Sequence, residues 1–414
     1  MASVSLLLVS FGASSSVSIG ASGGVATERA ARVLRDARDA HARRGAFSVV
    51  SHNILAPVYA VPGAFGLPGD VLAWPRRRER LCEQLAACDA DIVMLQEVQL
   101  STFMPDFDEL CAACGYEVAL QDDEAKRPYA NAILYRAARY ELVVQESRSR
   151  ALIVVLRERA RAEPVAPAGA AAAERRLLYL ANVHLTKGSS EQLTRLMQLR
   201  SLFRRLALHR DEQRALHARA ARAAAAANWS RTSAPREKTG DPLTAPLFES
   251  GVVAGDFNSA RKSTVYELMR DAGLTRFPAT TRRPGGAPAG SVRAFRTGFF
   301  AMRDVYQTVR PRWGPFEMSH ATRALLDYMW ASADLDVLET MPRCYERAHA
   351  ARFAEPTAPR GRDERPPQTS ACADDERGEA NARAAQPRLV LPSADGAYAS
   401  DHLPTGCTLA PRVR

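Results

Sequence analysis

The sequence predicts a layered α/β protein in which buried β-sheets are covered by helices. Its composition is that of an ordinary globular protein, with 46% hydrophobic and 25% charged residues in a chain of 414. Eight short apolar runs have strand character. They are 47–50, 91–95, 132–135, 152–156, 177–183, 251–254, 326–330 and 402–409. Helical patterns between them, over 76–88 and 191–210, supply the covering layers, because strands that are apolar on both faces must be covered on both faces.

Three segments interrupt this pattern with few large apolar residues. They are 157–176, 211–245 and 346–388, rich in Ala, Arg, Pro or Ser. Such segments cannot bury enough apolar area to offset the entropy of ordering them. Chemistry-bearing residues lie on both sides of each one, so we expect surface insertions within a single domain over 46–411.

Residues 1–45 form either a disordered or a targeting segment. They hold no acidic residue before Glu28 and then gain Arg29, Arg32, Arg35 and Arg38, which is the general composition of a mitochondrial presequence. The apolar run 4–11 is an alternative as the core of a signal peptide, although no positive charge precedes it. We expect a cytoplasmic or mitochondrial protein. No apolar run approaches the roughly 18–20 residues that cross a bilayer, so we expect no membrane span.

Charge and cysteine content carry little information about function. The formal net charge of +10 is compatible with a polyanionic partner. However, the basic residues are nearly all Arg in an Ala-rich chain, which indicates a compositional bias. Cys111 and Cys114 have C-x-x-C spacing without a second pair to complete a zinc site. We expect buried thiols in a reduced compartment.

Polar residues stand at the ends of six of the predicted strands. They are Asn53, Glu97, His184, Asp256 with Asn258, Asp327, and Asp401 with His402. In layered α/β proteins such residues converge on one rim of the sheets, where ligands usually bind. Carboxylate and amide oxygens suit Mg²⁺, and imidazole suits phosphoryl oxygens. Together they predict a metal and phosphoester site.

Each motif also has an ordinary structural interpretation. Glu97 can be a simple strand-end carboxylate, and Gly255 to Asn258 can be a turn. His184 on an apolar strand can be a satisfied core histidine. The joint occurrence of all six endings in one chain favours the site.

The ordered series SHNIL, LQEV, NVHL, GDFNS, LDYMW and SDHLP resembles the endonuclease/exonuclease/phosphatase superfamily, over residues 51–406. The branch that holds CCR4, nocturnin, angel and 2′-phosphodiesterase proteins is the most similar, since Asn53-Ile54-Leu55, Val183-His184-Leu185 and Leu391-Pro392-Ser393 match it. The resemblance implies a four-layer α/β sandwich, with two packed, mostly antiparallel mixed sheets flanked by helices.

Related branches match less well. An inositol-phosphatase-like chain would carry Trp-Asn at the first strand and Cys-Asp-Arg in place of Leu326-Asp327-Tyr328. Abasic-site endonucleases carry Tyr in the segment of His184. The chain departs from the expected branch in two places: residues 316–326 lack the usual Gly, and Ala399 replaces a Pro. These departures leave the substrate preference less well defined than the catalytic mechanism.

The resemblance implies a role for each of these residues. Glu97 would be the principal Mg²⁺ ligand, supported by Asn53, with Mn²⁺ as an alternative cation and Asp401 near a second, weaker position. Asp256 would orient and deprotonate the attacking water, and Asn258 would hold the water or the phosphate.

On the phosphate itself, His402 would stabilise the pentacoordinate phosphorus with its tautomer fixed by Asp327, and His184 would contact the phosphate from the other side. Asn53, His184, Asn258 and Phe257 are candidates to bind substrate, Phe257 by stacking on a base. Phe316 is a second candidate for stacking, and either ring can instead belong to the core.

The expected activity is that of a 3′→5′ exoribonuclease of the deadenylase type, with single-stranded RNA or poly(A) tails as partner. A phosphatase acting on a phosphorylated dinucleotide such as NADPH, and a catalytically silent RNA-binding relative, stay open. Arginines 195, 200, 204 and 205 of the predicted helix either line an RNA channel or form a solvated basic face. We expect no docking through leucine-rich repeats, since only about 45 residues precede the first strand and each repeat takes about 20–29.

Overall fold

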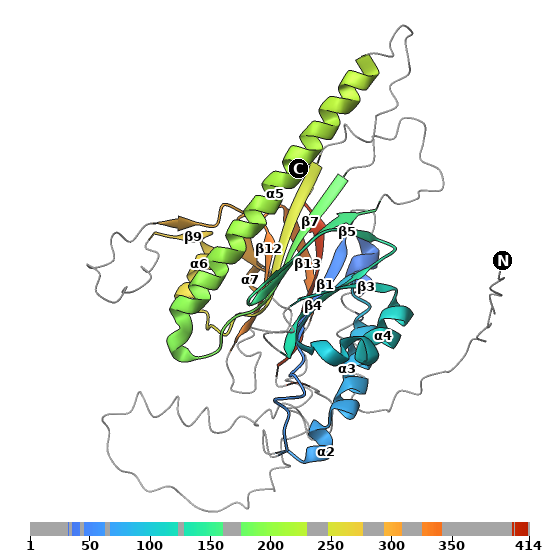
Figure 1. Cartoon of the computed structure of the whole chain (residues 1–414), viewed down its shortest axis with the longest axis vertical. Coiled ribbons are helices and arrows are strands. Elements are labelled where there is room, and N and C mark those ends of the chain that lie inside the picture. Colours follow the sequence, from blue (N-terminus) through green and yellow to red (C-terminus); the bar gives the residue numbers. More distant parts are fainter. Residues whose placement is uncertain are drawn as a thin grey trace, which may run out of the picture.

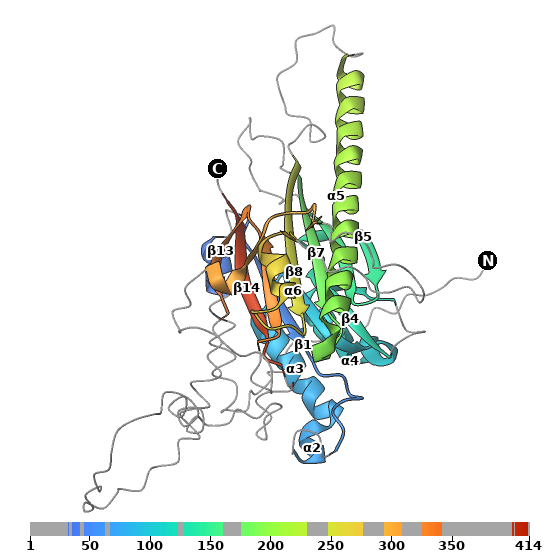
Figure 2. The ribbon, with the colours of Figure 1, turned by 90° about the vertical axis from the view of Figure 1, so that its left-hand side faces the viewer.

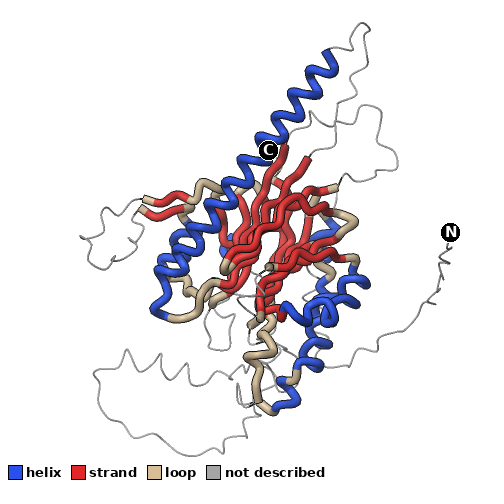
Figure 3. Tube along the Cα trace, in the orientation of Figure 1, coloured by secondary structure: helices blue, strands red, loops and turns tan. Residues whose placement is uncertain are grey.

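The computed structural model describes residues 32, 35–41, 45–62, 67–122, 128–159, 175–229, 247–275, 294–308, 325–341, 400 and 402–412. Within these ranges two six-stranded sheets pack face to face, with helices on their outer sides (Figures 1 and 3). The predicted four-layer α/β sandwich is confirmed.

The first sheet has the strand order β13-β14-β1-β2-β4-β3. Its strands are β1 (Phe47–Asn53), β2 (Ile92–Gln99), β3 (Tyr116–Leu120), β4 (Tyr129–Arg136), β13 (Leu335–Thr340) and β14 (Thr405–Pro411). β1 pairs with β2 in parallel and with β14 in antiparallel orientation. β14 therefore lies beside β1, which brings Ser400 and residues 402–404 next to the end of β1.

The second sheet has the order β11-β12-β8-β7-β6-β5. Its strands are β5 (Tyr140–Arg148), β6 (Ala151–Glu158), β7 (Arg175–His184), β8 (Leu247–Asp256), β11 (Met302–Asp304) and β12 (Asp327–Ser332). β7 and β8 are parallel, and the other neighbours in this sheet are antiparallel. A separate two-stranded ribbon joins β9 (Gly273–Leu274) to β10 (Phe295–Arg296).

Helices cover the outer face of each sheet (Figure 2). α3 (Trp74–Cys88) and α4 (Phe103–Cys114) share an apolar core with β1, β2 and β4 of the first sheet. α5 (Gln192–Trp229) and α6 (Thr264–Arg270) do the same on the second sheet. The short elements are α2 (Gly69–Leu72), α7 (Val305–Thr308) and the 3₁₀ turns Leu100–Thr102 and Ser189–Glu191. A third core lies between the sheets, where Val49 and Met94 meet Val154 and Val252.

The eight predicted strands all occur, with shifted ends. The last one begins at Thr405 and not at His402. The edge strands β5 and β13 were not predicted, because their half-buried residues alternate with polar ones and form no continuous apolar run.

The helix predicted over 191–210 is longer than expected. It continues to Trp229 and takes up the first part of the predicted insertion 211–245, because its Ala-rich end has high helix propensity. Figure 1 shows this end of α5 extending past the sheets. Whether the three segments are insertions stays a prediction, since 160–174, 230–246 and 342–399 lie outside the described residues.

The thiols were expected to be buried, and Cys88, Cys111 and Cys407 are, whereas Cys82 and Cys114 are half-buried. Cys82, Cys88, Cys111, Cys114 and Cys407 are free, and burial raises the pKa of Cys111 to about 11. No helix in the described part of the chain is both long and apolar enough to cross a membrane.

Candidate active site

The predicted polar residues converge at one rim of the sandwich. In the parallel pair β7–β8, His184 is the register partner of Asp256, and Asp327 on β12 faces Asp256 from the other side. On the first sheet, Asn53 ends β1, and its partner in β2 is Gln96, the residue before Glu97. The two sheets thus contribute opposite halves of the site.

A β-bulge points Glu97 into the site. Pairing between β2 and β4 shifts between Leu95 and Val98, and Glu97 has a φ of 63°, which a non-glycine residue seldom adopts. β2 continues to Gln99, so Glu97 does not end the strand as the sequence predicted. The bulge, and not a strand end, aims the carboxylate at the rim.

The turn after β8 depends on one glycine. Gly255 has a φ of 135°, and a Cβ atom there would lie 2.0 Å from the Val183 carbonyl oxygen. Only glycine therefore lets β8 approach β7 this closely. Asn258, at a φ of 47°, folds back so that its backbone N–H donates to Asp256 Oδ1 at 2.8 Å. This arrangement fixes the carboxylate of Asp256.

Asn53 lies at the centre of the cluster. Its Nδ2 is 3.1 Å from Glu97 Oε1 and 3.4 Å from Asp256 Oδ2. His184 Nε2 lies 3.7 Å from Glu97 Oε1 and 3.6 Å from Asp256 Oδ2. One amide and one imidazole therefore bridge two carboxylates that come from different sheets.

His402 completes the cluster. Its Nδ1 is 2.8 Å from Asp327 Oδ2, and its Nε2 is 3.8 Å from Asp256 Oδ2. The Asp327 contact places a proton on Nδ1 and turns Nε2 toward the site. Ser400 fixes the segment by donating to the Asn53 carbonyl at 2.6 Å and accepting from the His402 N–H at 3.2 Å.

The rim carries more negative charge than its protein neighbours compensate. Asp256 is 2% exposed. Burial raises its pKa to about 7, His402 opposes this rise, and the charges of Asp327 and Glu97 add to it. A bound cation would reverse the effect, since positive charge favours the ionised carboxylate.

The donor set suits a hard divalent cation. Glu97 and Asp256 offer carboxylate oxygens, each of which accepts more than one bond. Among the described residues, no three His, Cys, Asp or Glu side chains are arranged as a cage that could hold a metal ion. Mg²⁺ does not require one, because it keeps several waters and takes one or two carboxylates together with substrate phosphates.

Two of the predicted ligands need separate comment. Asn53 turns its nitrogen to the carboxylates, while its oxygen accepts the Leu55 N–H at 3.1 Å. In this geometry Asn53 positions Glu97, and its role as a metal ligand stays a prediction. Asp401 lies outside the described residues.

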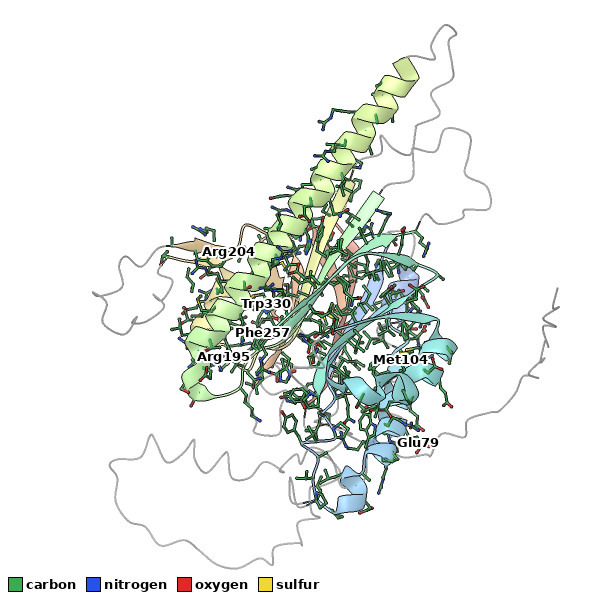
Figure 4. All side chains as sticks on the ribbon, in the orientation of Figure 1. Glu79, Met104, Arg195, Arg204, Phe257 and Trp330 are labelled. Atoms are coloured by element: carbon green, nitrogen blue, oxygen red, sulfur yellow. The ribbon has the colours of Figure 1, made fainter. Side chains whose placement is uncertain are left out.

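The proposed stacking role of Phe257 is wrong. Its side chain is 1% exposed and packs edge to face on Tyr328 at 5.6 Å, inside the core beneath α5 (Figure 4). The apolar ring is buried against the second sheet and cannot receive a base. Phe316, the other candidate, lies outside the described residues.

Two of the four α5 arginines singled out in the sequence make structural contacts. Arg195 is buried and donates to the carbonyls of Thr186 and Gly188. Arg205 donates to Glu146 of β5 at 2.9 Å. Of the four arginines named above, only Arg204 is exposed (Figure 4). An RNA channel along this face therefore has little support.

Sequence reasoning missed a buried polar network behind the site. Asn182 Nδ2 donates to the carbonyls of Leu95 and Ala132, and its Oδ1 accepts from Gln96 Nε2 at 2.7 Å. Asn131 donates in turn to the Asn182 carbonyl. The signal was present, since Asn182 is the one polar residue in the apolar run 177–183.

Together the fold and the rim define a site suited to phosphoesters. The Endonuclease/Exonuclease/phosphatase family matches residues 50–402, and the chain belongs to this family. All of the site residues named above lie within that match.

Curated relatives and solved structures support the branch expected from the motifs. The "CCR4-Not complex 3'-5'-exoribonuclease subunit Ccr4" of Kluyveromyces lactis is 30% identical over 114 residues, which cover 25% of this chain and 14% of the relative. The protein of the same name from Aspergillus terreus is 24% identical over 356 residues, covering 74% of this chain and 52% of the relative. The chain thus spans about half of these relatives or less.

A solved structure shares the fold. ANGEL2, described as a 2′,3′-cyclic phosphatase and crystallised with adenosine-2′,3′-vanadate, superposes with a TM-score of 0.55. Its sequence identity is 17%, over 89% of this chain and 96% of ANGEL2.

Proposed function

We propose that the protein is a Mg²⁺-dependent phosphodiesterase that shortens single-stranded RNA from its 3′ end and releases 5′-nucleoside monophosphates. The observation that carries the proposal is the cluster in which Glu97, Asp256 and two histidines from both sheets lie within 4 Å of their neighbours. The Ccr4 relatives are named 3′-5′-exoribonucleases, which supports this direction.

Glu97 would hold the cation, with Asn53 orienting its Oε1 and the Ala56 N–H its Oε2. The cation supplies charge stabilisation to the phosphate oxygens and the leaving oxygen. Mn²⁺ would serve as an alternative.

Asp256 would take the proton from the attacking water. Asn258 holds its Oδ1 through the backbone N–H, and the Asn258 side-chain amide also approaches Oδ2 at 3.1 Å. The carboxylate therefore keeps a fixed direction in which to orient the water. With the cation bound, Asp256 is ionised and can act as a base.

His402 and His184 would bind the phosphoryl oxygens from two sides. Asp327 stabilises a positive charge on His402 by accepting from Nδ1, which strengthens the Nε2 donor at the moment when negative charge builds on the phosphate. His184 lies between both carboxylates and would approach from the opposite side.

A substrate panel tests the proposal. The purified protein is incubated with Mg²⁺ and 5′-labelled RNA carrying a 3′ poly(A) tail, mixed-sequence RNA, single-stranded DNA, 2′-5′ oligoadenylate or NADPH. We expect a descending ladder on RNA, fastest on the poly(A) tail, and no ladder with EDTA or with a 3′-terminal phosphate. Intact RNA together with loss of the NADPH 2′-phosphate would replace this proposal by a dinucleotide phosphatase.

Two further outcomes are informative. Hydrolysis confined to RNA ends that carry a 2′,3′-cyclic phosphate would point to the activity for which ANGEL2 is described. RNA binding without turnover of any substrate would favour a silent relative, which the joint presence of Glu97, Asp256 and His402 argues against.

A further inference from the structure

The loop after β1 presents apolar side chains to solvent beside the rim. Val58, Tyr59 and Val61 are 52%, 44% and 52% exposed, whereas Ala60 packs with Leu55 in a small core below the loop. Large apolar side chains that cluster on the surface commonly mark binding sites.

The loop holds Tyr59 in one position. Tyr59 N–H donates to the Ala56 carbonyl at 2.9 Å, and Ala56 N–H donates to Glu97 Oε2 at 2.8 Å. The buried guanidinium of Arg77 donates to the carbonyls of Ile54 and Leu55 at 3.0–3.1 Å. The bond from Ala56 to Glu97 and the bonds from Arg77 together fix the base of this loop.

A second tyrosine extends the apolar surface toward the site. Tyr129, the first residue of β4, meets Tyr59 edge to face with ring centroids 5.2 Å apart, and the two hydroxyls are hydrogen-bonded. The Tyr129 ring lies 6.5 Å from that of His184. Three rings thus lead from the solvent to the atoms that contact Glu97 and Asp256.

Glu97 and Arg150 both influence the hydroxyl of Tyr59. Burial and the hydroxyl of Tyr129 raise its pKa, the charge of Glu97 adds to the rise, and Arg150 opposes it. Arg150 lies in the turn between β5 and β6, and its carbonyl accepts the His184 N–H at 3.0 Å. The backbone of Arg150 therefore lies beside His184.

We propose that Tyr59 and Tyr129 form a stacking surface for the base of the 3′-terminal nucleotide. The inference rests on the proposed function, which places the scissile phosphate among Glu97, Asp256 and His184. A nucleobase is the planar group that lies one sugar away from that phosphate. Aromatic stacking accepts every base, and the larger rings of purines gain more from it.

Kinetics on matched RNAs test the surface. One oligonucleotide ends in adenosine, and the other ends in an abasic ribose. On the first, Tyr59→Leu and Tyr129→Leu should each lower kcat/KM about tenfold or more. On the second they should match the wild type, because no base is present to stack. Met104→Ala, which truncates an equally exposed apolar side chain on α4, serves as a control that should change neither. Equal losses on both RNAs, or no loss on either, would overturn the proposal.

A binding experiment keeps the test independent of turnover. By calorimetry in Mg²⁺, wild-type protein should bind AMP about tenfold more tightly than ribose 5-phosphate, and Tyr59→Leu should abolish the difference. A variant that keeps the preference for AMP would refute the stacking role even if no RNA is hydrolysed. Failure of the proposed function would give a different result from failure of the stacking role, because the wild type itself would then hydrolyse no nucleic acid.

Discussion

The buried carboxylate of Asp256 makes stability depend on pH when no cation is bound. Its pKa is raised from 3.8 to about 7, first by burial and then by Asp327 and Glu97. A carboxyl group with a raised pKa contributes stability that is fully present below its unfolded value and is lost as the pH rises through its folded value. The metal-free protein should therefore lose stability between about pH 4 and pH 7 from this group.

Replacing the carboxylate by an amide removes this dependence. In Asp256→Asn the side chain is neutral at every pH and keeps nearly the same shape. A difference of one in pKa corresponds to about 1.4 kcal/mol, so the rise from 3.8 to about 7 lowers the free energy of unfolding of the wild type at pH 8 by an amount on the order of 4 kcal/mol. Between pH 5 and pH 8 the stability advantage of the variant over the wild type should grow by about 2 to 3 kcal/mol.

Urea unfolding of both proteins in EDTA, at pH 5 and pH 8, measures this difference. Addition of Mg²⁺ should stabilise the wild type more at pH 8 than at pH 5, because the cation favours the ionised carboxylate, and should stabilise the variant less. An advantage that stays constant or shrinks as the pH rises would refute the reasoning. It would mean that Asp256 is ionised in the folded protein without a cation.

Three further predictions concern single residues. Glu97→Ala should retain less than about one per cent of wild-type turnover while its circular dichroism is unchanged, because the main cation ligand is lost; higher activity in the purified variant would contradict this role. Gly255→Ala should lower the free energy of unfolding by more than about 3 kcal/mol, since its Cβ meets the Val183 carbonyl. Gly115→Ala serves as the control, because there is open space around its Cβ, and it should lower the free energy of unfolding by only about 1 kcal/mol. Equal losses for the two variants in urea titrations would refute the clash at Gly255. Asn182→Asp should lower the free energy of unfolding by about 3 kcal/mol or more at pH 7, because a carboxylate would face two carbonyl oxygens. A variant as stable as the wild type would disprove the importance of the network.

The parts of the fold that were predictable are those fixed by burial on both faces. Strands such as β6 and β8 have continuous apolar runs in their sequences, because each strand lies between the other sheet and a layer of helices. β5 and β13 lie at sheet edges, where half-exposed residues break such runs. The extension of α5 was missed for another reason: Ala-rich sequence was interpreted as low complexity, although Ala is the strongest helix former.

The site was predictable in its residue types and not in its geometry. Short motifs gave Glu97, Asp256 and His402, because a phosphate and a hard cation demand these groups. The sequence could not show that Phe257 turns into the core, since side-chain direction after β8 depends on the close approach at Gly255. Tyr59 and Tyr129 carried no motif, and 69 residues separate Tyr59 from the ring that it contacts, so only the folded chain reveals the pair.

The buried network explains how two sheets can hold one site. Glu97 belongs to the first sheet and Asp256 to the second, so a slip of one sheet on the other would separate them. Gln96, the residue before Glu97, donates a hydrogen bond to Asn182 of β7. Asn182 lies two residues before His184, and its amide also donates to backbone carbonyls of β2 and β4. An apolar core tolerates small sliding, whereas these directional bonds break with it. The polar residues therefore fix the register between the sheets at the rim, and the distances between Glu97, Asp256 and His184 depend on that register.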